Sequence, residues 1–83
     1  PNPFNPRTAV NFTLPAAGPV RVQIWDAAGR RVKTLQDGHL AAGRHVLDWD
    51  GSDQRGARLA SGTYFIRIQA GDATQVEKVT LLQ

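Results

Sequence analysis

The sequence predicts an all-β protein built as an antiparallel sandwich of about seven short strands. Apolar and polar residues alternate with a period of two along most of the chain, and no segment shows the period of an amphipathic helix. Turn-forming residues interrupt this alternation about every 8–12 residues, which is the spacing typical of sandwich domains. The chain is 83 residues long, so it holds one small domain.

The first half of the chain contains three of the expected strands. Residues 9–14 alternate, and Pro15 ends this strand because proline has no backbone N–H to donate. Residues 20–25 alternate in the same way. After a turn, a third strand begins near Val32 and is expected to stop at Asp37–Gly38, a dipeptide typical of tight turns.

The second half adds four strands. Residues 44–49 form the fourth, and a polar loop leads from it to a short strand around Leu59. Residues 61–70 form the longest strand, which is expected to return as residues 74–82 through a two-residue turn at Gly71–Asp72. This pattern is typical of an immunoglobulin-like sandwich, although the Cys-Trp-Cys signature of antibody domains is missing.

The chain opens on PNPFNPRT, in which Pro1, Pro3 and Pro6 fall within six residues. Proline fixes φ and pushes the preceding residue toward extended conformations. We therefore expect residues 1–7 to form an extended lead-in from an upstream domain. The C-terminal immunoglobulin-like domain is then expected to cover residues 8–83.

Composition and charge argue against several classes of function. The net charge is +3, from ten Lys and Arg against seven Asp and Glu. The basic residues are spread along the sequence, which argues against a nucleic-acid interface. No apolar run reaches the roughly 20 residues of a membrane span, so direct membrane insertion is not expected. Cys is absent, so the fold has neither disulfides nor thiolate-bound metals.

The nucleophiles and bases of the chain form no recognisable catalytic motif. Ser52 lies in an Asp-rich loop, Ser61 lies in a Ser-Gly turn, and neither is in a nucleophile elbow. His39 and His45 belong to a small β domain, where histidines are usually surface or strand residues. A sandwich of this size also has little volume for a cleft with paired carboxylates. We expect neither enzymatic activity nor a cofactor.

The stretch DWDGSDQRG contains three carboxylates, those of Asp48, Asp50 and Asp53, in a short loop. Hard cations such as Ca²⁺ favour oxygen ligands of this kind, so these residues are candidate metal ligands. The spacing differs from that of an EF-hand, and a commoner structure is an Asx turn, in which Asp side chains accept backbone N–H groups. We favour the turn.

Three aromatic residues, Trp25, Trp49 and Tyr64, are candidates for a sugar-binding platform. Trp25 falls on the face opposite the apolar residues of its strand, whereas Tyr64 shares a face with apolar residues. Separated aromatic residues are more often core residues. The sequence favours the core for them and leaves a sugar site open.

Four segments together resemble a known family: NPFNPRTAVNFTLP, VQIWDAAGRRVKTL, AAGRHVLDWDGSDQRG and LASGTYFIRIQAGDATQVEKVTLL. They are similar to the immunoglobulin-like domain shared by the flagellar hook-capping protein and the C-terminal sorting domain of the bacterial type IX secretion pathway. The similarity covers nearly the whole chain. The positions that match the family motifs are Pro1, Asn2, Pro3, Asp26, Gly29, Arg30, Trp49, Asp50, Gly51, Asp53, Gly56, Ser61, Gly62 and Tyr64.

The resemblance implies a non-catalytic C-terminal sorting domain of a secreted protein. Such a domain would direct its protein through the periplasm of a Gram-negative bacterium to the outer cell surface. The implied partners are the outer-membrane secretion machinery and an upstream cargo domain in the same chain. A terminal edge strand offers unpaired backbone groups for strand addition. The residues expected to bind the partner are therefore Lys78, Val79, Leu81 and Leu82.

Two other functions remain open from the sequence. One is a structural assembly module, as in the hook-capping protein. The other is a carbohydrate-binding module that accompanies an upstream enzyme. Lys78 also has two possible roles, because a charge on an edge strand can favour one register with a partner or can prevent aggregation.

Overall fold

The computed structural model describes residues 7–83. The motif positions Pro1, Asn2 and Pro3 lie outside the described residues, as does all of the expected lead-in except Arg7. Within residues 7–83 no helix is long and apolar enough to cross a membrane.

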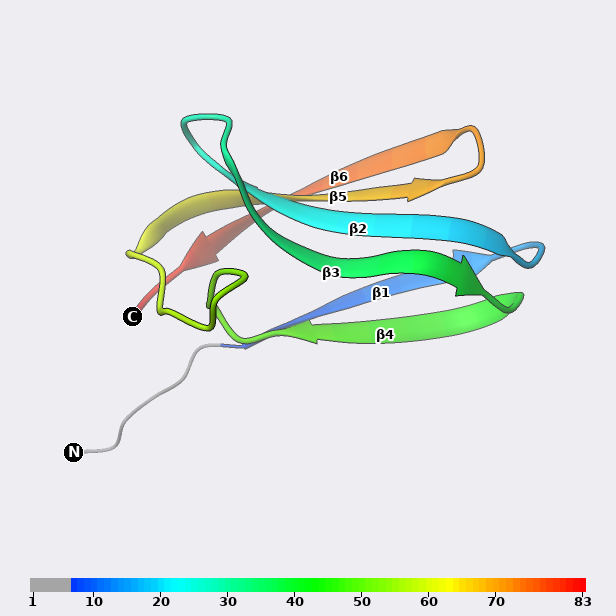
Figure 1. Ribbon diagram of the computed structural model, residues 1–83, viewed down its shortest axis with the longest axis horizontal. Coiled ribbons are helices and arrows are strands. Elements are labelled where there is room, and N and C mark those ends of the chain that lie inside the picture. Colours follow the sequence, from blue (N-terminus) through cyan, green and yellow to red (C-terminus); the bar gives the residue numbers. More distant parts are fainter. Residues whose placement is uncertain (1–6) are drawn as a thin grey trace.

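The described chain forms six antiparallel strands in two sheets (Figure 1). A two-stranded sheet pairs β1 with β4, and a four-stranded sheet has the order β3-β2-β5-β6. The predicted all-β sandwich is therefore confirmed. The strands are β1 (Thr8–Leu14), β2 (Gly18–Asp26), β3 (Arg31–Leu40), β4 (Gly43–Trp49), β5 (Gly62–Ala70) and β6 (Ala73–Leu81).

One apolar core fills the space between the two sheets. The period-two alternation turns every second side chain of β1 and β5 inward, as a strand with one buried face requires. Trp49, at the end of β4, is the largest fully buried side chain. The core residues are Val10, Phe12, Leu14, Val20, Val22, Ile24, Trp49, Tyr64, Ile66, Ile68 and Leu81.

Two strand predictions are wrong in detail. No strand forms around Leu59, because the loop closes on itself instead: its only ladder contact among the described residues is an isolated bridge between Ser52 and Arg58. β3 does not stop at Asp37–Gly38 but continues to Leu40. Continued pairing with the first half of β2 satisfies the backbone of both strands, so the turn lies beyond Leu40.

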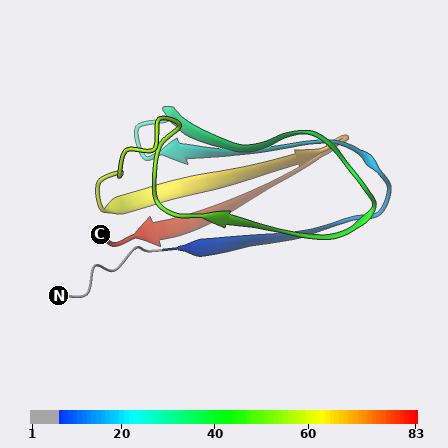
Figure 2. The ribbon, with the colours of Figure 1, turned by 60° about the horizontal axis from the view of Figure 1, so that its bottom comes forward.

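The two sheets differ in width, and this leaves one side of the sandwich open. β6 lies at the edge of the wider sheet, and its last residues end at the same end of the molecule where β1 begins (Figure 2). Glu77 lies directly opposite the buried Ile66 and so is on the inner side of β6, yet it is exposed. The smaller sheet therefore does not cover this part of β6.

Candidate functional site

The four-stranded sheet ends in two edge strands, β3 on one side and β6 on the other. An edge strand presents unpaired backbone groups, which makes it a place where another chain can add a strand. The two edges differ in regularity and in cover, and this difference points to the candidate site.

The β3 edge is irregular and partly covered. Its pairing with β2 shifts register twice, between Val22 and Gln23 and between Ile24 and Trp25. Gln54, from the loop after β4, forms hydrogen bonds with the unpaired backbone edge of β3. Its backbone N–H donates to the carbonyl of Val32 (3.0 Å), and its side-chain Oε1 accepts from the backbone N–H of Thr34 (2.8 Å). These bonds occupy backbone groups that an added strand would need.

The loop that carries Gln54 is held by its own side chains. The indole Nε1 of Trp49 donates to the carbonyl of Ser52 (2.9 Å). The carboxylate of Asp50 accepts from the hydroxyl of Ser52 (2.6 Å) and from its backbone N–H (3.1 Å). The hydrogen bond from the Ser52 hydroxyl is the main cause of a lowered pKa for Asp50, and burial of the carboxyl partly opposes this effect. Lys33 of β3 donates to the same hydroxyl (3.0 Å), which ties the loop to the edge strand.

The three candidate metal ligands have separate roles. Asp53 accepts from the backbone N–H groups of Arg55 and Ala57, both at 2.9 Å, in an Asx turn. Asp50 is bound to Ser52, and Asp48 is an exposed residue of β4, opposite Ala9. Across residues 7–83 no three His, Cys, Asp or Glu side chains gather in a way that could hold a metal ion.

The motif positions Asp26, Gly29 and Arg30 form the turn between β2 and β3. Asp26 accepts from the backbone N–H groups of Ala28 and Arg30, both at 2.9 Å, and from the Arg30 Nε (3.0 Å). The backbone bond from Arg30 is the main cause of a lowered pKa for Asp26, against an opposing effect of burial. This motif therefore builds a turn.

Tyr64 forms a tyrosine corner at the start of β5. Its hydroxyl donates to the carbonyl of Ala60 (2.7 Å), four residues upstream, as in many immunoglobulin-like domains. Its ring meets Trp49 edge-on, with centroids 5.5 Å apart. Burial, followed by the charge of Asp26, raises the pKa of Tyr64. Trp49 and Tyr64 are 2% and 6% exposed, so these two rings and Trp25 form no sugar-binding platform.

The serines and histidines also have local roles. The Ser61 hydroxyl accepts from the backbone N–H of Gln83 (2.9 Å), which fastens the C-terminal end of the described chain. His45 stacks on Phe12, with centroids 5.5 Å apart, and bonds to the carbonyl of Ala41 (2.7 Å). His39 is exposed on β3.

The β6 edge is regular. All nine of its residues pair with β5 without a register shift. The four expected partner-binding positions differ in exposure. Lys78 is exposed on the outer side, Val79 is half-buried and Leu81 is buried on the inner side, and Leu82 is 68% exposed just beyond the strand.

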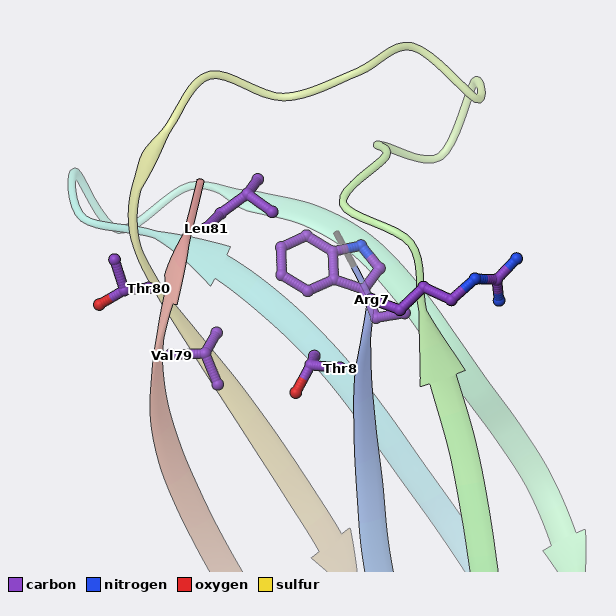
Figure 3. A pocket seen from close by; sticks show the side chains of 6 residues that line it. Arg7, Thr8, Val79, Thr80 and Leu81 are labelled. Carbon is purple, nitrogen blue, oxygen red and sulfur yellow. The ribbon is translucent and has the colours of Figure 1, made fainter. Parts of the chain in front are cut away.

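A pocket of about 150 Å³ lies between the end of β6 and the start of β1 (Figure 3). Val79 and Leu81 point into it from β6, Thr8 faces them from β1, and Thr80 points away (Figure 3). Trp49 also lines this space. Thr8 was not predicted, because the expected partner contacts lay on the last strand alone.

A family described as the FlgD Ig-like domain matches residues 5–74. The chain belongs to this family. The basal-body rod modification protein FlgD of Salmonella typhimurium is 41% identical over 56 residues, which are 68% of this chain and 24% of that protein. FlgD of Escherichia coli K12 is 37% identical over 57 residues, 69% of this chain and 25% of that protein. The chain thus spans about a quarter of the curated relatives it matches.

Two solved structures share the fold of this FlgD Ig-like domain. FlgD from P. aeruginosa matches with a TM-score of 0.70 and 26% identity, over 92% of this chain and 60% of that one. FlgD from Xanthomonas campestris matches with a TM-score of 0.68 and 34% identity, over 92% of this chain and 56% of that one. The Xanthomonas structure is described as giving insights into the hook capping essential for flagellar assembly.

These matches overturn the expected type IX sorting function. The relatives are flagellar proteins named for rod modification and hook capping. The expected partners, an outer-membrane secretion machinery and an upstream cargo domain, are wrong for the same reason, and so is the expected route to the outer cell surface. The motifs could not separate the two branches, because Asp26, Trp49 and Tyr64 all build turns or core and carry no information on the partner.

Proposed function

We propose that this FlgD Ig-like domain, residues 8–83, is a non-catalytic structural module that joins flagellar subunits during hook assembly. It acts by binding and carries out no reaction. The observation that carries the proposal is the difference between its two sheet edges, because β6 is regular and lies beside a pocket, whereas β3 is bulged and partly covered.

An extended segment of a flagellar subunit would add to the sheet along β6. Strand addition takes its affinity from main-chain hydrogen bonds and its specificity from pockets for alternate side chains. The added strand would run beside Val79 and Leu81, which already line the pocket toward β1. An apolar cavity of about 150 Å³ accepts a benzene molecule, so this pocket is large enough for one branched apolar side chain.

Charges next to the pocket select the partner strand. Glu77 lies on the inner side of β6 and Lys78 on the outer side, and both are exposed. An added strand must place an opposite charge, or none, across from each of them, since like charges directly opposite are destabilising. The pair therefore favours one register. Leu82, at the end of the strand, adds an exposed apolar contact.

Site-specific photo-crosslinking in the full-length protein, in its own cells, tests the proposal. A photo-reactive phenylalanine analogue replaces Lys78 on β6 in one variant and His39 on β3 in a matched control. Both positions are exposed, and by register both lie on the outer side of the sheet. We expect crosslinks to a hook or rod subunit from position 78 and not from position 39. Equal crosslinking from both positions, or no flagellar product, would contradict the proposal.

A second arm separates recognition from folding. The crosslinker is placed at Leu82, and Lys78→Glu is introduced in the same chain. Because Lys78 is exposed, the free energy of unfolding should change by no more than about 0.5 kcal/mol. We expect a folded protein with a lower yield of the crosslinked product. An unchanged yield would remove Lys78 from the interface.

A further inference from the structure

The outer face of the four-stranded sheet gathers the excess positive charge of the protein. Five charged side chains lie on it by strand register: Arg21, Arg31, Arg67, Lys78 and Asp37. Four basic residues and one acidic residue give this face a net charge of +3. The whole chain carries ten basic and seven acidic residues, also +3, so the remaining six basic and six acidic residues cancel.

The centre of this face is a stacked pair. The guanidinium carbon of Arg67 lies 5.2 Å from the ring centroid of Trp25, which is a cation–π distance. Phe65 lies directly across from Trp25 on β5, and Val76, directly across from Arg67 on β6, is 57% exposed. Arginine and large aromatic residues at the centre of a patch are typical of binding hot spots.

Two buried donors of this pair have no hydrogen-bond partner among the described residues: the indole Nε1 of Trp25 and the Nε of Arg67. A buried donor without an acceptor is destabilising, because burial removes its hydrogen bond to water and nothing replaces that bond. Both donors belong to side chains on the outer sheet face, and Arg67 lies over the ring of Trp25, so we infer that a rotation of Arg67 away from the ring lets an acceptor from outside reach them. A carboxylate is the strongest acceptor for a guanidinium, because it can take a bidentate, charge-assisted bond.

We propose that this face binds an acidic segment of a partner protein. A carboxylate of the segment accepts from Arg67 and from the indole N–H of Trp25. Strand register places Arg31, Trp25, Phe65 and Lys78 in one row across the sheet, and further acidic residues of the segment contact Arg31 and Lys78 at the two ends of this row. Apolar side chains between them pack on Phe65 and Val76. The surface goes beyond the proposed strand addition, since it uses the face of the sheet and needs no unpaired backbone.

The geometry favours a protein partner over a nucleic acid. Single-stranded nucleic acids bind to open aromatic faces on which bases stack. Arg67 already lies over the Trp25 ring, and Phe65 is partly buried. The charge of the face is also small and mixed with apolar side chains, which suits an acidic, partly apolar peptide better than a phosphate backbone.

An NMR titration of the 83-residue chain tests this proposal. The probe is a blocked synthetic peptide of repeated Glu-Leu-Glu-Gly units, and its control has Gln in place of Glu. The chain has two tryptophans, and Trp49 is an internal reference because its indole N–H is already bound to Ser52. We expect the Glu peptide to shift the indole N–H signal of Trp25 and leave that of Trp49 in place. We expect the Gln peptide to shift neither.

Two matched variants complete the test. Arg67→Gln should weaken binding of the Glu peptide at least about tenfold, the loss typical of a central Arg anchor. Arg44→Gln removes the same charge from an exposed position on β4, in the other sheet, and should bind like the parent chain. An unshifted Trp49 signal in each variant confirms the fold. Equal weakening by both variants, an unmoved Trp25 signal, or tighter binding of a single-stranded oligonucleotide than of the Glu peptide would overturn the proposal.

Discussion

The two edges of the four-stranded sheet are protected by different means. β3 is protected by geometry: two register shifts distort its ladder, and Gln54 occupies the backbone groups of Val32 and Thr34. β6 pairs along its whole length with β5, and the features that discourage a second chain are two exposed charges, Glu77 and Lys78. Natural edge strands use both kinds of protection.

The difference has a functional consequence. Bulges and hydrogen bonds within the chain close an edge to every partner. Charged side chains block the edge only against strands that do not carry complementary charges. An edge protected by charge can therefore stay monomeric and still accept one selected strand. For this reason the proposed assembly contacts lie on β6, and altering one edge at a time should separate the two kinds of protection.

The largest effect is expected at Gly51, where the loop that covers β3 touches the end of β6. A Cβ at this position would lie 2.9 Å from Cδ1 of Leu81, and the backbone has a φ of +83°. Leu81 is buried, so its side chain would have to shift toward the neighbouring pocket to make room for the added methyl group. Gly51→Ala should lower the free energy of unfolding by about 2–4 kcal/mol, from left-handed strain and overpacking together. Chemical denaturation measures this loss.

Gly56→Ala is the matched control for this prediction. Gly56 lies in the same loop with a similar φ of +88°, but nothing is within 4 Å of a Cβ there. This variant should lose only about 1–2 kcal/mol, from backbone strain alone. Equal losses in the two variants would mean that the contact between the loop and Leu81 contributes nothing.

Gln54→Ala should uncover part of the β3 edge. It removes the side-chain acceptor of the Thr34 N–H and leaves the backbone bond to Val32 in place. The expected loss is about 1 kcal/mol, the net value of one hydrogen bond, and the amide of Thr34 should exchange with solvent faster. Hydrogen exchange followed by NMR measures this. Gln75→Ala, at an exposed position of β6, should leave the exchange of Thr34 unchanged.

Local pattern was enough to predict most of the sandwich. The alternation in residues 9–14 and 61–70 marks the buried faces of β1 and β5, because one face of each strand is in the core. It failed at Asp37–Gly38, where pairing with β2 outweighs the turn preference of the dipeptide. Turn propensity is a local signal, whereas strand pairing depends on residues far away in the sequence.

The candidate site was only partly predictable, for a related reason. The sequence pointed to the last strand, since a terminal strand is often an edge. It gave no sign that Gln54 reaches β3, or that Arg67 and Trp25 stack. These contacts join residues 20 and 42 positions apart. The basic residues appear scattered in the sequence, yet strand register brings four of them to one face.

Acidification should destabilise the loop that covers β3, through protonation of Asp50. Its folded pKa lies below the ordinary value of 3.8, mainly because the Ser52 hydroxyl donates to it. The carboxylate therefore adds stability above about pH 3.8, and this contribution is lost as the pH falls through the lower folded pKa. We expect Asp50→Asn to lower the Tm at neutral pH and to reduce the fall in Tm on acidification. Asp48→Asn, at an exposed position of β4, is the charge-matched control and should leave that fall as in the parent. An equal fall in Tm in the parent and in Asp50→Asn would contradict this role of Asp50.

The smallest effect on stability is expected from removing the charges of β6. This change also tests most directly whether the β3 and β6 edges are protected by different means. Glu77 and Lys78 are both exposed, so Glu77→Val with Lys78→Val should change the free energy of unfolding by no more than about 1 kcal/mol, within about 0.5 kcal/mol for each position. Valine also favours strands. The uncharged edge should then pair with a second copy, and sedimentation velocity should show dimers that increase with concentration.

Thr34→Val is the control on β3, where the backbone N–H is already bound to Gln54, and it should stay monomeric. Dimers in both variants would mean that Gln54 does not close β3. A monomeric double variant would mean that β6 is kept apart by something other than its charges, and strand addition at this edge would lose its main support.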